Sequence, residues 1–360
     1  MYFSLEYDQL STLPVMCATA VGLAIVWGII FEISKKRIHD SLPNTAWWHR
    51  AVKPTKSMMA NFGYPKQATD KFPNGITDSM ARDFYAFLVM ICGQHFVSAS
   101  AMVPVLVYGW EESSDTAKSL FILGTLSDLG FDIYDAMSSS IRTFSNHPDP
   151  LPLDFWIVIV ALHHTTALSL VLPMNLNYVH RFEFHQTTVS LLMAASLCYA
   201  AGCYKFSLDI GKKKGFLLYK FIVLLQLGII FYTRVYLWFP AVISFRAHLK
   251  EQNDTAFFYG ASVMMSIFSL FNLILVADGF KAAIKCIPKK FPKTQSEKEK
   301  TAKIFRRASG MDAPGFAHLA EVKRMMARRK FKGTVHSIIA ATRMESSMSN
   351  AASSHNEKAD

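Results

Sequence analysis

Several signatures of disulfide-rich, phosphate-binding and metal-binding proteins are missing from this chain. It has 5 cysteines in 360 residues, and most of them lie within apolar runs, which argues against a disulfide framework. The sequence has no glycine-rich phosphate loop, no metal-ligand spacing of a known kind, and no alternating ten-residue segments typical of a membrane β-barrel. From the sequence we therefore expect a helical protein without disulfides, and neither a metal nor a cofactor is predicted.

Long apolar runs are what the sequence does have. Hydrophobic residues make up 51% of the chain. A helix needs about 20 apolar residues to cross a hydrocarbon core of about 30 Å, and backbone groups in lipid must pair within their own segment. We predict an all-α polytopic membrane protein with seven transmembrane helices, of which the third is the weakest because three aspartates interrupt it. The predicted spans are 13–33, 84–108, 117–137, 153–174, 187–207, 216–245 and 257–284.

Charged residues lie in the gaps between these runs and predict the orientation. The net charge is +11, and bases cluster in the gap 34–82, at Lys212–Lys214 and after residue 284, whereas the gap after the second run holds Glu111 and Glu112. Lys and Arg concentrate on the cytosolic side of membrane helices. Seven spans place every basic gap on one side, which predicts a lumenal N-terminus and a cytosolic C-terminus. This distribution argues against nucleic-acid binding.

The chain divides into three predicted regions. Residues 1–83 hold one helix and a basic cytosolic connector, residues 84–286 hold six helices joined by short loops, and residues 287–360 form a basic tail. Part of the tail has apolar residues at helical spacing among bases, and it could bind an anionic leaflet or calmodulin, or serve only as a solvated flank. Its apolar positions are Phe316, Leu319, Val322, Met325 and Met326.

Ionisable side chains in the middle of apolar runs are the main indication of function. A charge or an imidazole in hydrocarbon is costly and usually faces a protein interior or a water-filled cavity. At about 1.5 Å per residue, His163, Asp128 and His95 each lie roughly 15 Å from one end of their runs. Asp128, Asp132 and Asp135 follow a four-and-three spacing, which puts them on one helix face. We predict that these groups line a common cavity.

The adjacent histidines His163 and His164 can supply acid–base or nucleophilic chemistry, with an aspartate holding one tautomer. We predict that both are catalytic, supported by Asp135 or Asp128. A purely structural role, in which the imidazoles join helices through hydrogen bonds, is the alternative. Asp132 and Asp135 lie nearer the cytosolic end, where a water-filled mouth would also explain them.

Further polar residues lie on other predicted spans. Arg234 and Asn272 are candidate cavity residues, and Arg234 could pair with one of the acids, which would reduce its desolvation cost. For the neutral Gln226 and the pair Thr165-Thr166 we favour hydrogen bonds between helices.

Five short elements, in order along residues 84–286, resemble the TLC domain, the six-helix membrane domain of ceramide synthases and their non-synthase relatives. They are Phe131-Asp132-Ile133-Tyr134-Asp135; Leu162-His163-His164; Glu183 with the segment to Thr188; Phe231-Tyr232-Thr233-Arg234-Val235 with Pro240; and Phe271-Asn272 with Phe280-Lys281.

The resemblance implies a helical barrel around a lipid-sized cavity, in a protein of the endoplasmic reticulum. In the synthases, the histidine pair serves amide formation between a long-chain base and acyl-CoA, which would make acyl-CoA a co-substrate here. This chain departs from the synthases after the pair, because it lacks their polar stretch with His-Asp and Ser-Asp. The resemblance is therefore closer to the non-synthase relatives, and it implies a protein that binds or alters membrane lipids.

Two alternatives remain open. The chain could be an N-acyltransferase like the synthases, or a seven-helix receptor, since the predicted topology matches. The receptor hypothesis is weaker because the chain has no Asp-Arg-Tyr after the third helix and no Asn-Pro-x-x-Tyr in the seventh. Lys281 lies near the end of the last run, where snorkelling explains it, so a retinal-binding role is not favoured either.

Overall fold

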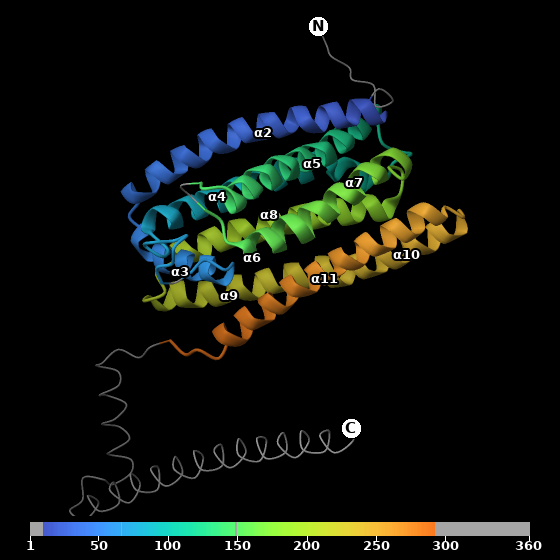
Figure 1. Cartoon of the computed structure of the whole chain (residues 1–360). Coiled ribbons are helices and arrows are strands. Elements are labelled where there is room, and N and C mark those ends of the chain that lie inside the picture. Colours follow the sequence, from blue (N-terminus) through green and yellow to red (C-terminus); the bar gives the residue numbers. More distant parts are fainter. Residues whose placement is uncertain (1–9, 66, 148–149, 292–360) are drawn as a thin grey trace, which may run out of the picture. The chain divides into compact units, whose positions relative to one another are not determined.

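The computed structural model describes residues 10–65, 67–147 and 150–291, and Figure 1 shows that long helices run side by side through most of them. Within the described residues the β-structure is limited to one isolated bridge, between Thr69 and Phe72. The predicted all-α class is therefore confirmed for this part. The predicted amphipathic segment of the tail lies outside the described residues.

Seven long helical segments account for the predicted apolar runs, and two short helices follow the first of them. The long segments are α2 (Leu13–Ser41), α4 (Asp78–Tyr108), α5 (Asp115–Phe144), α6–η2–α7 (Leu153–Trp156, Ile157–His164, Thr165–Asn177), α8 (Phe182–Ser207), α9–η3–α10 (Lys213–Phe231, Tyr232–Leu237, Trp238–Glu251) and α11 (Thr255–Cys286). The short ones are η1 (Leu42–Asn44) and α3 (Trp48–Asn61). Sequence reasoning left the connector without a helix, so α3 is an addition.

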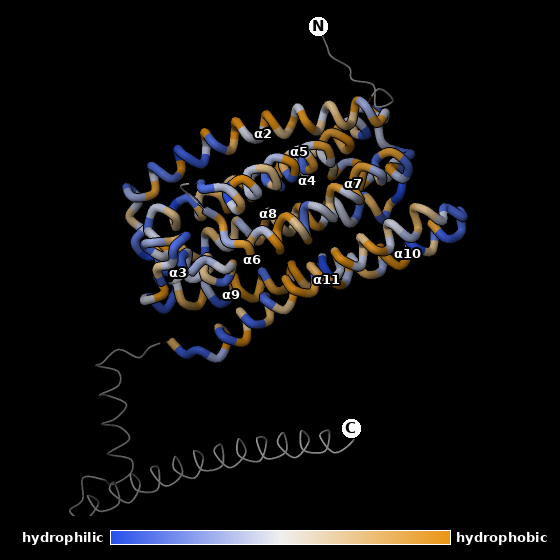
Figure 2. Tube along the Cα trace, viewed as in Figure 1, coloured by the Kyte–Doolittle hydropathy of each residue, from blue (hydrophilic) through white to orange (hydrophobic). Residues whose placement is uncertain are grey.

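Six of the long segments are long and apolar enough to cross a membrane, and Figure 2 shows the hydrophobic residues distributed along them. Several helices of this kind in one chain are typical of a multi-pass membrane protein. The other long segment is α5, the run that its aspartates made weakest in the sequence. It packs against α2, α4 and α7, so much of its surface faces protein.

Side-chain caps extend several helices beyond the apolar runs that predict them. Thr77, Ser114 and Asp254 each accept a hydrogen bond from the backbone N–H three residues ahead, at the starts of α4, α5 and α11. Such caps satisfy backbone donors that the first turn leaves free. Because these residues are polar, hydropathy alone places the start of α4 at Phe84, six residues after its observed start at Asp78.

Small residues bring α5 close to its neighbours and fix its rotation. A Cβ on Gly130 would lie 2.8 Å from the carbonyl oxygen of Ala20 and 2.9 Å from the amide of Ala24, both on α2. Close backbone approach at glycine is a common packing device between membrane helices. Asp128 and Asp132 are each two residues from Gly130, which is roughly 200° around an α-helix. The contact with α2 therefore turns these aspartates toward the other side of α5.

Candidate functional site

An elongated cavity of about 210 Å³ lies inside the helical unit. Its walls come from α4, α5, the α6–η2–α7 segment, α8, η3–α10 and α11, with Phe62 contributed from the end of α3. Among the described residues that line it, none belongs to α2. Six helical segments therefore enclose the cavity, while α2 packs outside it on α5 and α4.

The cavity is apolar at most points along its length. Phe155 and Met174 both line it and belong to one helical segment, and a rise of about 1.5 Å per residue places them roughly 28 Å apart along the axis. Apolar side chains form most of the wall, and phenylalanine and leucine are the most frequent of them. Such a wall suits a hydrocarbon chain.

Polar side chains form a band partway along this apolar cavity, and His164 is at its centre. His164 Nε2 lies 2.8 Å from Asp135 Oδ2, in hydrogen-bond geometry. His164 Nδ1 lies 2.8 Å from Asp132 Oδ1 as an ion-pair contact that is not aligned as a hydrogen bond. The exposed fractions of His164, Asp132 and Asp135 are 3%, 2% and 4%. The imidazole is thus held between two buried carboxyl groups of α5.

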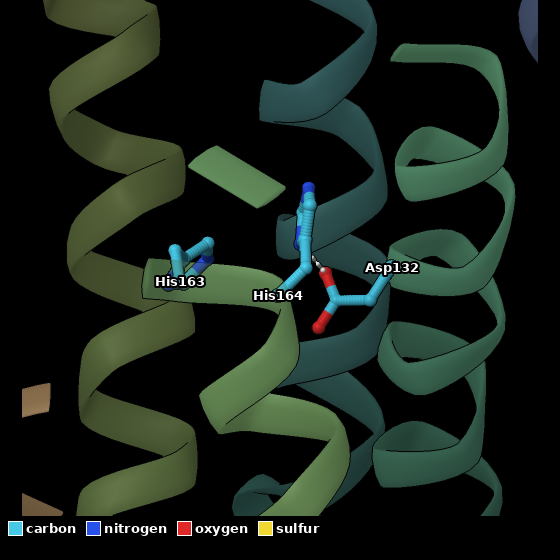
Figure 3. A group of neighbouring side chains, drawn as sticks. All are labelled: Asp132, His163 and His164. Carbon is cyan, nitrogen blue, oxygen red and sulfur yellow. Dashed lines mark ion pairs between the residues drawn. The ribbon is translucent and has the colours of Figure 1, made fainter. Parts of the chain in front are cut away.

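His163 differs from its neighbour because its ring lies among aromatic side chains. The ring stacks on Phe271 at 4.8 Å between centroids and lies 5.6 Å from Phe268. Its buried Nδ1 has no hydrogen-bond partner among the described residues. Figure 3 shows His164 between His163 and Asp132, with the ion pair drawn to Asp132. His163 therefore has a ring nitrogen without a hydrogen bond in an aromatic setting, whereas both ring nitrogens of His164 lie beside carboxyl oxygens.

A second histidine–carboxyl pair joins α4 to α5. His95 Nδ1 lies 3.3 Å from Asp128 Oδ1, and Gln94 also donates to Asp128 Oδ1 at 3.4 Å. The His95 ring lies 6.3 Å from that of Tyr199 on α8. Both His95 and Asp128 line the cavity, as predicted from their similar depth in the sequence.

Arg234 contributes a cation to the cavity wall from η3. It is buried, donates to Asn272 Oδ1, and lies with its guanidinium carbon 5.8 Å from the centre of the Phe271 ring. Phe271 therefore contacts both Arg234 and His163. Cation–aromatic contacts of this kind stabilise a desolvated charge by about 2 kcal/mol, and they offset part of the cost of burying Arg234.

The histidine pair and Arg234 lie on the two π-helical segments of the described chain, η2 and η3. Single π-turns within α-helices are rare and often occur at functional sites. In η2, four β-branched residues, Ile157 to Val160, come before the histidine pair. Such a run is as compatible with a regular buried helix as with a π-turn. This feature was missed from the sequence, and we find no signal in the sequence that marks it.

Glu183 lies apart from this polar band. It lines the cavity near the start of α8, where Arg181 donates to it at 2.9 Å and Ser244 at 2.6 Å. Tyr199, which contacts His95, is further along α8 by roughly 24 Å at about 1.5 Å per residue. The structure therefore brings together the other predicted residues but leaves Glu183 at one end of the cavity. Asp132 and Asn272, predicted as cavity residues, are buried and do not line it.

Two interpretations from the sequence were wrong. Asp132 and Asp135 do not line a water-filled mouth, because both are almost fully buried against His164. Arg234 forms its hydrogen bond with Asn272 instead of an acid, because η3 packs on α8, α10 and α11, whereas the aspartates are on α5.

The interhelical hydrogen bonds predicted for the neutral polar residues are confirmed for Gln226 but not for the threonine pair. Gln226 donates to the Cys198 carbonyl of α8 at 2.7 Å, so its predicted interhelical bond is confirmed. Thr165 and Thr166 instead donate to carbonyls of their own helical segment, those of Val160 and Leu162. The five cysteines are all free, as expected.

Asp132, His163 and His164 are also the residues that could hold a metal ion. Each offers a possible ligand atom, and these atoms all lie within 4.8 Å of one another. Comparison of the chain with protein-family models, curated proteins and solved structures finds no match. The geometry of this cavity is therefore the main indication of function.

Proposed function

We propose that this protein binds a membrane lipid in the cavity and takes part in membrane lipid homeostasis, as the non-synthase TLC proteins do. One observation carries the proposal: an apolar cavity roughly 28 Å long has a band of histidines and aspartates partway along it. An acyl chain spans about half of a 30 Å hydrocarbon core, so the apolar wall has room for one on either side of the band. The polar band would then contact the headgroup or linkage of the bound lipid.

Orientation and compartment are part of the same proposal. The resemblance to the TLC domain supports a location in the endoplasmic reticulum, and the basic gaps support a lumenal N-terminus and a cytosolic C-terminus. The basic tail would then lie at the anionic cytosolic leaflet.

Lipid binding is tested by filling the cavity. Ala195 lines the cavity from α8, while Ala200 on the same helix is exposed on the outside. Wild type, Ala195→Trp and Ala200→Trp are purified in one detergent, and the lipids retained after gel filtration are measured by mass spectrometry. We expect a defined lipid with wild type and Ala200→Trp, and its loss from Ala195→Trp. Equal retention by both variants would rule out the cavity as the binding site.

The alternative function is an N-acyltransferase that joins acyl-CoA to a long-chain base. The unpartnered Nδ1 of His163 favours it, because His163 lines the cavity and an imidazole nitrogen there could take the proton from an attacking amine. Purified protein is given both substrates, and amide formation is followed by mass spectrometry for wild type and His163→Ala/His164→Ala. Amide from wild type alone would establish the acyltransferase. No amide from a wild type that retains lipid would favour the binding function.

A further inference from the structure

The side chains that could bind a metal come from two helical segments far apart in the sequence. Asp132 is on α5, and His163 and His164 end η2. They are the one such group of three among the described residues. Because the ligands do not share a short motif, no metal-binding pattern is visible in the sequence.

His164 has the surroundings of a metal ligand with a supporting carboxylate. Its Nε2 is within hydrogen-bond distance of Asp135 Oδ2, and its Nδ1 is close to Asp132 without an aligned hydrogen bond. Histidines that bind metals almost always donate their other ring N–H to a carboxylate, a carbonyl or water. In this arrangement Asp135 fixes the tautomer of His164 and leaves its Nδ1 lone pair beside Asp132.

His163 adds a second nitrogen that the protein itself does not satisfy. Its Nδ1 is buried without a hydrogen-bond partner among the described residues, and leaving such an atom unsatisfied costs about 1–3 kcal/mol. The ring is supported on its face by Phe271. A ligand at Nδ1 would remove this cost without moving the aromatic support.

We propose that Asp132, His163 and His164 bind a divalent transition-metal ion, zinc or ferrous iron, with Asp135 as the supporting carboxylate. Two imidazoles and one carboxylate are a ligand set that suits both ions. A dication would also compensate two carboxylates that are otherwise buried beside one imidazole. Three protein ligands leave a further coordination position, as in catalytic metal sites, and two of the three, His163 and His164, line the cavity.

The observed spacing requires a small adjustment. Ligand atoms about 2.1 Å from a tetrahedral ion are roughly 3.4 Å from one another, whereas the farthest pair here lies within 4.8 Å. His164 and Asp132 are already closer than that at 2.8 Å. His163 can close the remaining distance by side-chain rotation because no hydrogen bond holds its Nδ1. The metal-free alternative is an imidazolium of His164 paired with both carboxylates.

Metal content distinguishes these two arrangements. The full chain, with any histidine tag removed, is purified from cells grown with added zinc and iron, and the metals are measured by elemental mass spectrometry. We expect about one zinc or iron per chain in wild type, and less than a tenth of that in Asp132→Ala and His163→Ala. Asp128→Asn is the matched control, because Asp128 is one turn away on α5 and pairs with His95. It should retain the metal.

Cobalt binding by wild-type protein keeps the test independent of how the variants fold. After removal of bound metal, Co²⁺ is titrated, and visible absorption bands that saturate at one ion per chain are expected. Asp135→Asn should weaken Co²⁺ binding by about 10–100-fold. Folded wild type without metal and without cobalt bands would overturn the site, as would equal metal loss in Asp128→Asn. Lipid retention is a separate measurement and is independent of this result.

Discussion

Two histidine–carboxyl pairs lie at a similar depth in the cavity wall, and they differ in how completely each imidazole is held. His164 has a carboxyl oxygen 2.8 Å from each ring nitrogen. His95 has one carboxyl oxygen, at 3.3 Å and without hydrogen-bond alignment. Charge interactions strengthen steeply as distance and local dielectric fall. The His164 group is therefore the structural centre of the polar band, whereas the His95 pair is a looser contact at its edge.

The difference also concerns what is left free for chemistry. Both nitrogens of His164 lie beside carboxyl oxygens of α5, so the aspartates can fix the η2 turn on which His163 is carried. His163 has the nitrogen without a partner. Both histidines are proposed metal ligands, and His163 is in addition the candidate base of the alternative acyltransferase function.

The largest expected effect comes from removing His164. The His164→Ala substitution leaves Asp132 and Asp135 buried without their shared partner, and breaking a buried pair in this way costs about 3–5 kcal/mol. The free energy of unfolding, measured by denaturant titration in mixed micelles, should fall by that amount. His95→Ala is the matched comparison and should cost less. Equal costs for the two substitutions would contradict the difference between the pairs.

The second prediction is that stability returns when the two carboxylates left without His164 are neutralised. Adding Asp132→Asn and Asp135→Asn to His164→Ala neutralises both carboxyl groups, so the triple variant should recover about 1–3 kcal/mol through coupling between contacting sites. The same unfolding titration measures it. A triple variant that is less stable than His164→Ala alone would show that the carboxyl charges do not cause the loss.

The third prediction concerns the looser pair. Asp128→Asn keeps the shape of the side chain and removes a charge whose nearest imidazole contact is unaligned, so we expect a loss of about 1 kcal/mol or less. A loss as large as that of His164→Ala would mean that the two pairs contribute equally to stability.

The sequence predicts which residues share the cavity, but not which aspartates contact His164. Counting residues from the ends of apolar runs placed His163, Asp128 and His95 at one depth, and the structure brings their side chains into one cavity wall. Depth alone did not identify the partner of His164, because Asp128, Asp132 and Asp135 lie within two turns of one helix. The rotation of α5 decides it, and that rotation depends on Gly130 against α2, a tertiary contact.

The helices themselves were easier to predict than their local geometry. Each apolar run lies within a long helical segment, because backbone pairing in lipid leaves few alternatives. The π-turns η2 and η3 change which way His164 and Arg234 point. The residue types of η2 and η3 are those of an ordinary buried helix, so periodicity in the sequence does not reveal them.

An effect of similar size is expected at a polar contact outside the spanning segments, in the turn between α7 and α8. Tyr178 donates to Asp254 Oδ2 at 2.8 Å, and burial, together with this hydrogen bond, raises the pKa of Tyr178 to about 12. The protonated hydroxyl therefore stabilises the fold at neutral pH, and this contribution should disappear as the pH rises from about 10, the ordinary tyrosine pKa, to about 12. Tyr178→Phe should cost about 1 kcal/mol at pH 7, and its difference from wild type should shrink above pH 10. A difference that stays constant across this range would show that the hydroxyl contributes nothing through its proton.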